Sequence, residues 1–120
     1  MADGWQGLDF KPRTDYVTFE VLRHRIWQIN EEQGRTIVNS SGSVVASEAN
    51  DFNVGITTSD GQIVAFGTYV FYHLAGIRIT IENALRFFGK DGLREGDLYL
   101  SNDPYVGGLH QNDMSVLGPV

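Results

Sequence analysis

The sequence predicts an α+β domain in which two amphipathic helices pack on a mixed or antiparallel sheet. Three observations support this prediction: two apolar stripes with helical spacing, a Ser-Asp-Gly turn between two strand-like segments, and two further strand-like segments after the second stripe. The resulting order is helix, hairpin, helix, strand, loop and strand, which favours an α+β domain.

The length and composition are those of one globular folding unit. The chain has 120 residues, of which 42% are hydrophobic and 20% are charged, so a packed core is expected. There is no cysteine, so any metal ion must be bound by His, Asp, Glu or backbone oxygen.

The first helix is expected after an extended arm. Residues 1–13 contain glycines and a proline without a clear period, and we expect them to form this arm. A helix is predicted from Thr14 or Asp15, either of which can cap it, to about Val38. Its apolar face comprises Phe19, Leu22, Ile26 and Ile29. Gly34 lies inside this helix at a cost of about 1 kcal/mol relative to Ala, which indicates either a close contact of the helix or an early end.

A polar connection and a hairpin are predicted next. The segment from Asn39 to Asp51 is rich in Ser, Asn and Gly, as a connection is. Two strands then surround Ser59-Asp60-Gly61, where Asp-Gly can supply the positive φ angles of a tight hairpin turn.

The second helix and the last two strands complete the prediction. The helix has Gly89 placed to terminate it, and its apolar stripe comprises Leu74, Ile77, Ile81, Leu85 and Phe88. Residues 98–101 (LYLS) are predicted to form a short buried strand, and residues 114–120 (MSVLGPV) a strand after a long loop. Because this apolar run continues to Val120, we expect the fold to be an incomplete part of a larger domain, either an N-terminal piece or a subunit completed by another chain.

The charge pattern argues against two classes of partner. Nine basic residues against 15 acidic ones give a formal net charge of -6, and no Lys/Arg cluster could track a phosphate backbone, so no nucleic acid is expected. No apolar run is long enough to span a bilayer, and the N-terminus lacks both a basic start and a hydrophobic segment. We therefore expect no membrane partner and a cytoplasmic location.

The stretch SNDPYVGGLHQNDMSV, residues 101–116, carries the first candidate site residues. His110 and Asp113 are three residues apart on a loop that leads into a strand, so an imidazole nitrogen and a carboxylate oxygen can turn toward one divalent metal ion. Alternatively, Asp103-Pro104 starts a turn, Gly107-Gly108 continues it, and both candidate ligands are solvated.

A second polar cluster, SEANDFNVG, places Asp51 at the predicted start of a strand beside two asparagines. If the two strands lie close together in the sheet, Asp51 adds a third ligand to His110 and Asp113. The alternative is a connection made of turn-forming residues.

His73 interrupts an apolar and aromatic run at the predicted start of the second helix. It is either a partly buried histidine bonded to a backbone carbonyl or a catalytic residue. A helix N-terminus disfavours the cationic imidazole, so a neutral His73 facing a cleft would be a usable acid or base.

Four segments resemble, in order and spacing, the N-terminal region of the hydantoinase B/oxoprolinase family: DYVTFEVLRHRIWQINEEQG, SEANDFNVGITTSDGQIVA, HLAG and GDLYLSNDPYVGGLHQNDMSVLGPV. The resemblance covers residues 14–120, and its most specific part is the NDPY-x-GG-x-H-xx-D block. The family includes ATP-dependent N-methylhydantoinases, 5-oxoprolinases and lactamases, and B-type subunits of acetone and acetophenone carboxylases.

The resemblance implies partners and cofactors. In this family the B-type chain works with an A-type subunit, which has an actin-like fold and binds the ATP that activates an amide or enolate oxygen. It also implies a divalent metal (Zn, Mn or Mg), for which the matching positions are Asp51, His110 and Asp113, with a further histidine expected beyond Val120. His73 matches a family histidine. Family members are several times longer than 120 residues, so the remaining B-type region or chain is an expected partner, together with a small-molecule substrate.

Two functional hypotheses follow. In the first, residues 14–120 are the N-terminal portion or a small subunit of an ATP-dependent hydantoinase, oxoprolinase or ketone carboxylase-type complex, active only with its partner chains. Its metal would polarise a carbonyl, a phosphoryl oxygen or a water, and His73 would shuttle a proton. In the second, the chain is a non-catalytic interaction subunit that docks on the A-type partner.

Overall fold

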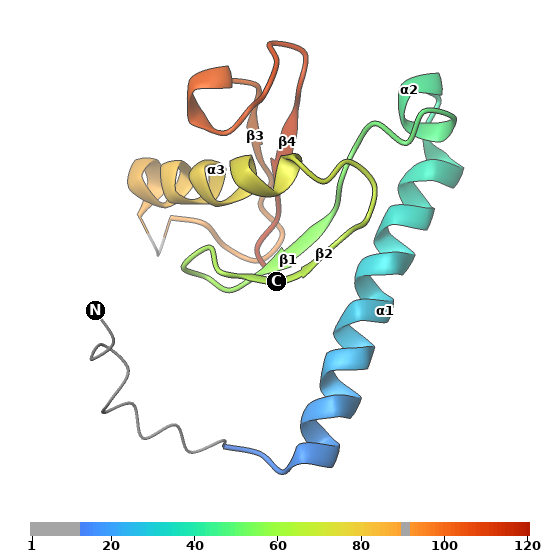
Figure 1. Cartoon of the computed structure of the whole chain (residues 1–120). Coiled ribbons are helices and arrows are strands. Elements are labelled where there is room, and N and C mark those ends of the chain that lie inside the picture. The colour runs from blue at the N-terminus through green and yellow to red at the C-terminus, as the bar shows by residue number, and fades with distance from the viewer. Residues whose placement is uncertain (1–12, 90–91) are drawn as a thin grey trace, which may run out of the picture.

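The structure is a computed structural model, and it describes residues 13–89 and 92–120. Apart from Arg13, the arm predicted for residues 1–13 lies outside the described residues. The described chain is an α+β fold with two small antiparallel sheets, which confirms the predicted fold class. The long helix α1 stands beside the hairpin of β1 and β2, and α3 lies between that hairpin and the sheet of β3 and β4 (Figure 1).

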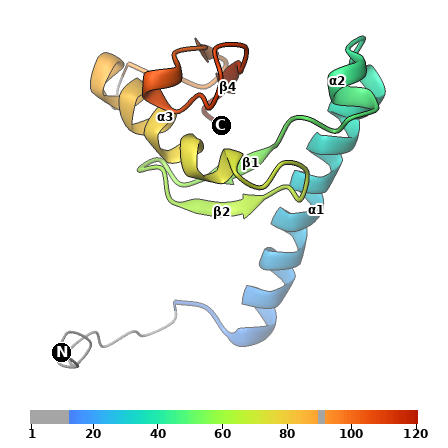
Figure 2. The ribbon, with the colours of Figure 1, turned by 45° about the horizontal axis from the view of Figure 1, so that its top comes forward.

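Helix α1 spans Tyr16–Ser40 and ends two residues beyond the predicted Val38. Asp15 caps it, because one carboxylate oxygen accepts a hydrogen bond from the Thr18 backbone N–H at 3.0 Å. The residues that α1 buries are Asn30 and Gly34, whereas most of the predicted apolar stripe remains exposed. The contact between α1 and β2 is made near the middle of the helix, as Figure 1 and Figure 2 show.

Gly34 makes the close contact that was one of its two predicted roles. A Cβ atom at this position would lie 2.5 Å from Cε2 and 2.8 Å from Cζ of Tyr69. Tyr69 in turn contacts Phe52, with ring centroids 4.3 Å apart. Glycine at residue 34 thus lets the helix backbone touch an aromatic pair beside the hairpin.

The connection after α1 contains a single-turn helix, α2 (Val44–Ser47), which the sequence did not predict. The hairpin that follows is confirmed: β1 (Gly55–Thr57) pairs antiparallel with β2 (Ile63–Phe66). Of the predicted Asp-Gly pair, only Gly61 has a positive φ, at 83°. The turn therefore runs from Thr58, whose N–H donates to the Gln62 carbonyl at 2.8 Å, and is wider than a two-residue turn.

Helix α3 spans His73–Phe88 and ends at Gly89, whose φ is 73°. Two residues of its predicted apolar stripe pack on the hairpin: a Cβ at Gly55 would lie 3.1 Å from Ile77, and a Cβ at Gly61 would lie 3.3 Å from Ile81. The prediction of this helix and of its end is confirmed.

Strands β3 (Tyr99–Ser101) and β4 (Ser115–Leu117) form the second sheet, with Leu100 opposite Val116. These two side chains are 56% and 55% exposed, so the prediction that residues 98–101 form a buried strand is wrong. The two-stranded sheet has one face against α3 and one open face, and the middle side chains point to the open face. Within residues 13–89 and 92–120, the buried apolar side chains are only Val54, Ala65 and Ala84.

In the described part of the chain, no helix combines the length and the apolar character needed to cross a membrane.

Candidate site at the β3–β4 loop

The loop between β3 and β4, residues 102–114, carries His110 and Asp113 and begins with a short 3-10 helix, Pro104–Val106. Asp103 caps this helix, because its Oδ1 accepts a hydrogen bond from the Tyr105 N–H at 2.9 Å. The chain then turns at Gly107, whose φ of 109° strongly favours glycine. Asp103 and Pro104 therefore shape the loop, as their turn chemistry predicted.

Asp113 holds the second half of the loop together. Its Oδ2 accepts hydrogen bonds from the backbone N–H groups of Leu109, at 2.9 Å, and His110, at 3.0 Å. Its own N–H donates to the His110 carbonyl at 3.2 Å. One carboxylate thus fixes the turn that presents the His110 side chain, which is exposed.

The surroundings of the Asp113 carboxyl group shift its pKa. Partial burial of the carboxyl raises its pKa, but the two backbone hydrogen bonds and the charges of His73 and His110 outweigh this effect. The pKa of Asp113 is therefore lowered from its ordinary value of 3.8, and the group is ionised at neutral pH.

His73 is the first residue of α3, as predicted, and its side chain is half-buried. Its backbone N–H donates to the Val70 carbonyl at 3.3 Å, and its ring meets the edge of Tyr72 at a centroid distance of 5.3 Å. The backbone of α3 at Gly76 lies against Gly107, so the first turns of this helix contact the β3–β4 loop. The sequence placed His73 on a helix start but held no local signal for this proximity.

Asp51 is placed differently from the expectation. It lies four residues before β1 rather than at the start of that strand, is exposed, and donates its N–H to the Val45 carbonyl at 3.0 Å. The next residues run beside the approach to α3, where Asn53 Nδ2 donates to the Val70 carbonyl at 2.7 Å. Since β1 belongs to one sheet and β3 and β4 to the other, the shared sheet that would have joined Asp51 to the loop does not exist.

A three-ligand metal centre is not formed by the described residues alone. Among residues 13–89 and 92–120, no group of three or more His, Asp or Glu side chains lies close enough to hold a metal ion. His110 and Asp113 supply an imidazole nitrogen and a carboxylate oxygen, which are donor types that suit a divalent ion. The loop therefore offers ligand types without a complete set.

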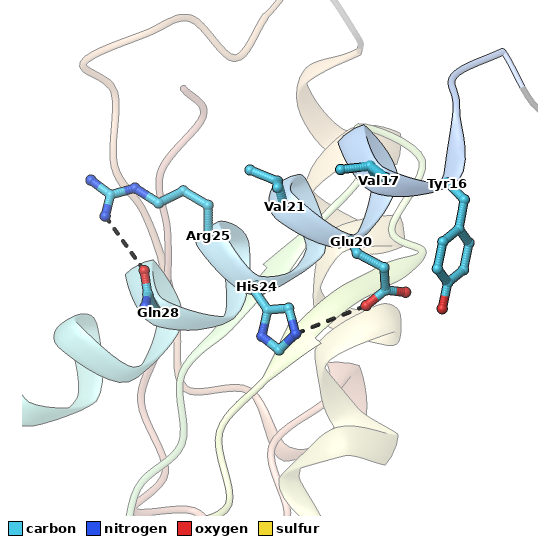
Figure 3. Close-up of a pocket in the computed structure, with 7 residues that line it drawn as sticks. All are labelled: Tyr16, Val17, Glu20, Val21, His24, Arg25 and Gln28. Atoms are coloured by element: carbon cyan, nitrogen blue, oxygen red, sulfur yellow. Dashed lines mark hydrogen bonds and ion pairs between the residues drawn. The ribbon is translucent and has the colours of Figure 1, made fainter.

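Surface hollows lie on two elements of interest among the described residues, the β3–β4 loop and α1. One is lined by loop residues: Pro104, Tyr105, Leu109, His110, Gln111 and Asn112. The other is lined only by residues of the N-terminal half of α1: Tyr16, Val17, Glu20, Val21, His24, Arg25 and Gln28 (Figure 3). Because one side of a single helix cannot enclose a ligand, the α1 hollow is not a candidate active site, although it is apolar in part.

The comparisons with known proteins show that this α+β region is of the hydantoinase, oxoprolinase and carboxylase type. The chain belongs to the hydantoinase B/oxoprolinase family, which it matches over residues 15–120. It is 35% identical over 106 residues to 5-oxoprolinase 1 of Arabidopsis thaliana, covering 88% of this chain and 8% of the relative.

It is also 35% identical over 115 residues to the acetophenone carboxylase delta subunit of Aromatoleum aromaticum, covering 94% of this chain and 16% of the relative. A 5-oxoprolinase of Dictyostelium discoideum is 30% identical over 106 residues, covering 88% of this chain and 8% of the relative. The chain thus spans less than a fifth of the length of these relatives. No solved structure matches it.

Proposed function

We propose that this chain is the N-terminal portion or a small subunit of an ATP-dependent hydantoinase, oxoprolinase or ketone carboxylase-type complex, and that it contributes ligands to a divalent-metal site. The observation that supports this proposal is the loop geometry, in which Asp113 orients the backbone of His110 beside the start of α3. The family match covers the whole of this arrangement.

The proposed roles follow from position and chemistry. His110 and Asp113 would bind the metal ion (Zn, Mn or Mg), with Asp51 and a residue from outside this chain completing the set. When bound, such an ion polarises a carbonyl or phosphoryl oxygen or lowers the pKa of a water. Oδ2 of Asp113 accepts hydrogen bonds from the Leu109 and His110 N–H groups, and its carboxylate would supply an oxygen ligand. His73 would shuttle a proton at the start of α3.

Three partners belong to this proposal. They are an A-type subunit that binds ATP, the remaining B-type region or chain, and a small-molecule substrate in the cytoplasm. The relatives include 5-oxoprolinases and an acetophenone carboxylase subunit. A cyclic amide or a ketone is therefore the substrate class to test first.

The test is a set of matched variants in the complete complex. His110→Ala and Asp113→Ala are compared with His24→Ala, an exposed histidine on α1, and with Asp97→Ala, an exposed carboxylate that also bonds a turn N–H, from Arg94 at 2.9 Å. We expect the two site variants to lose bound metal and ATP-dependent turnover of 5-oxoproline, hydantoin or acetophenone with bicarbonate, and both controls to keep them. Full metal content and turnover in His110→Ala and Asp113→Ala would show that the site assignment is wrong.

One observation favours a second function, that of a non-catalytic interaction subunit. Leu100 and Val116 form an exposed apolar pair on one face of the second sheet, and no other strand of residues 13–89 and 92–120 pairs with the outer edges of β3 and β4. Such a surface suits docking on the A-type partner. Size-exclusion chromatography distinguishes the two: aggregation that a co-expressed partner prevents supports docking, whereas a stable monomer with bound metal contradicts it.

A further inference from the structure

We propose that Gly76 and Thr80 of α3 are positioning residues that seat the β3–β4 loop and thereby set where His110 and Asp113 lie relative to His73. This inference rests on the proposed function for its catalytic consequence, although the seat itself is a feature of the described residues. Neither residue is a candidate ligand or acid–base group.

The first part of the seat is a pair of glycines whose backbones touch. A Cβ at Gly76 would collide with the Gly107 carbonyl oxygen and lie 3.0 Å from its carbonyl carbon. A Cβ at Gly107 would collide with Thr80 Oγ1 and lie 2.6 Å from the Gly76 carbonyl oxygen. A side chain at either position would overlap the backbone of the other segment, so the two glycines allow the loop to lie directly against α3.

The second part is the Thr80 hydroxyl, which lies within 3.2 Å of two carbonyl oxygens, those of Gly76 and Val106. Thr80 is 2% exposed, and it is among the most deeply buried polar residues of the described chain. Because a hydroxyl has one proton, the two carbonyls share it, and the bond to Val106 ties the 3-10 helix of the loop to α3. A buried hydrogen bond of this kind costs more to remove than an exposed one.

The seat and His73 lie on one face of α3. Residues 73, 76 and 80 are separated by three and four positions, so these positions follow one another along the same side of the helix. After Gly107-Gly108 the loop continues directly to Leu109 and His110, whose N–H groups donate hydrogen bonds to Asp113. A shift of the loop on the seat would therefore move Asp113 and His110 relative to His73.

The experiment removes the hydroxyl while keeping the side-chain shape. Thr80→Val is compared with Thr80→Ser, which keeps the hydroxyl, and with Thr36→Val, in which an exposed threonine on α1 loses the same type of helix bond, 2.7 Å to the Glu32 carbonyl. In the complete complex, amide hydrogen exchange is measured at residues 106–113 and in the β1–β2 hairpin. ATP-dependent turnover is measured in parallel, with kcat and KM determined separately.

We expect Thr80→Val to speed exchange at Leu109 and His110 about fivefold, as the loss of one hydrogen bond predicts, while the hairpin keeps its protection. Its kcat should fall about 10- to 100-fold with KM for ATP unchanged, because misplaced groups slow the chemical step. Thr80→Ser should recover most of both, and Thr36→Val should change neither.

Unchanged exchange at residues 109 and 110 in Thr80→Val would overturn the seat itself. Faster exchange with undiminished kcat, in a complex that His110→Ala inactivates, would overturn its role in positioning. Failure of the proposed function is recognised separately, because His110→Ala and Asp113→Ala would then keep full turnover whatever Thr80→Val does.

Discussion

The contact between Gly34 and Tyr69 permits a sharp test of the packing of α1, because one substitution should change sign with its background. Alanine at residue 34 gains about 1 kcal/mol over glycine from helix propensity. Its Cβ would lie 2.5 and 2.8 Å from Cε2 and Cζ of Tyr69, however, and relieving such overlap in a packed site costs about 1–3 kcal/mol. Gly34→Ala is therefore expected to lower the free energy of opening of the α1 centre by up to about 2 kcal/mol.

In a Tyr69→Ala background the ring is absent, so only the helix propensity remains. There Gly34→Ala should raise the opening free energy by about 1 kcal/mol. The assay is amide hydrogen exchange at residues 30–38 in the four members of this double-mutant cycle. Gly42→Ala is the control, because a Cβ at Gly42 has no neighbour within 4 Å. A Gly34→Ala effect of the same sign in both backgrounds would refute the argument that Tyr69 is what requires the glycine.

Two further predictions concern the loop and the hairpin. Asp113→Asn should raise hydrogen exchange at the Leu109 and His110 amides near neutral pH, where the carboxylate of the native residue is ionised. Since the pKa of Asp113 is lowered on folding, its stabilising effect is fully present above the unfolded pKa and is lost as the pH falls through the folded pKa, below 3.8. The variant should lack this acid-dependent loss of protection. An identical loss in both proteins would contradict the role given to Asp113. Gly61→Ala should destabilise the hairpin by about 1–2 kcal/mol, measured by exchange in β1 and β2, because residue 61 has a φ of 83°; a neutral effect would mean that the turn relaxes at no cost.

The elements with strong local signals were predicted well. Helix α3 combines an apolar stripe with a terminal glycine, and the β1–β2 hairpin surrounds an Asp-Gly turn, so each is specified by residues close together in the sequence. Helix α2 has one turn and no such pattern, since the valines that form half of it are typical of strands.

Burial was predicted less well, because it depends on what covers a face. The apolar stripe of α1 has the correct period, yet Phe19 and Leu22 are 51% and 53% exposed. The helix instead contacts its neighbours through Gly34, a position that hydrophobic periodicity does not mark. Leu100 was likewise expected to be buried and lies on an open sheet face.

In the candidate site, too, local features were predicted and contacts between distant segments were not. The residue types and the His-x-x-Asp spacing of the loop were evident in the sequence, as was the family resemblance, and the family match over residues 15–120 confirms the latter. The contact of the loop with α3 was not evident, because it is made by Gly107 against Gly76, two residues far apart in the sequence.

Local chemistry in the sequence thus determined helices α1 and α3, the glycine-containing turns, the cap at Asp15 and the family. Only the tertiary structure decided which faces are covered, that Asp51 precedes a strand of the other sheet, and that the loop packs on α3 at Gly76 and Thr80. The physical reason is that turn geometry and helical periodicity arise from neighbouring residues, whereas a glycine-to-glycine contact and a shared hydroxyl proton require two distant segments to be packed together first.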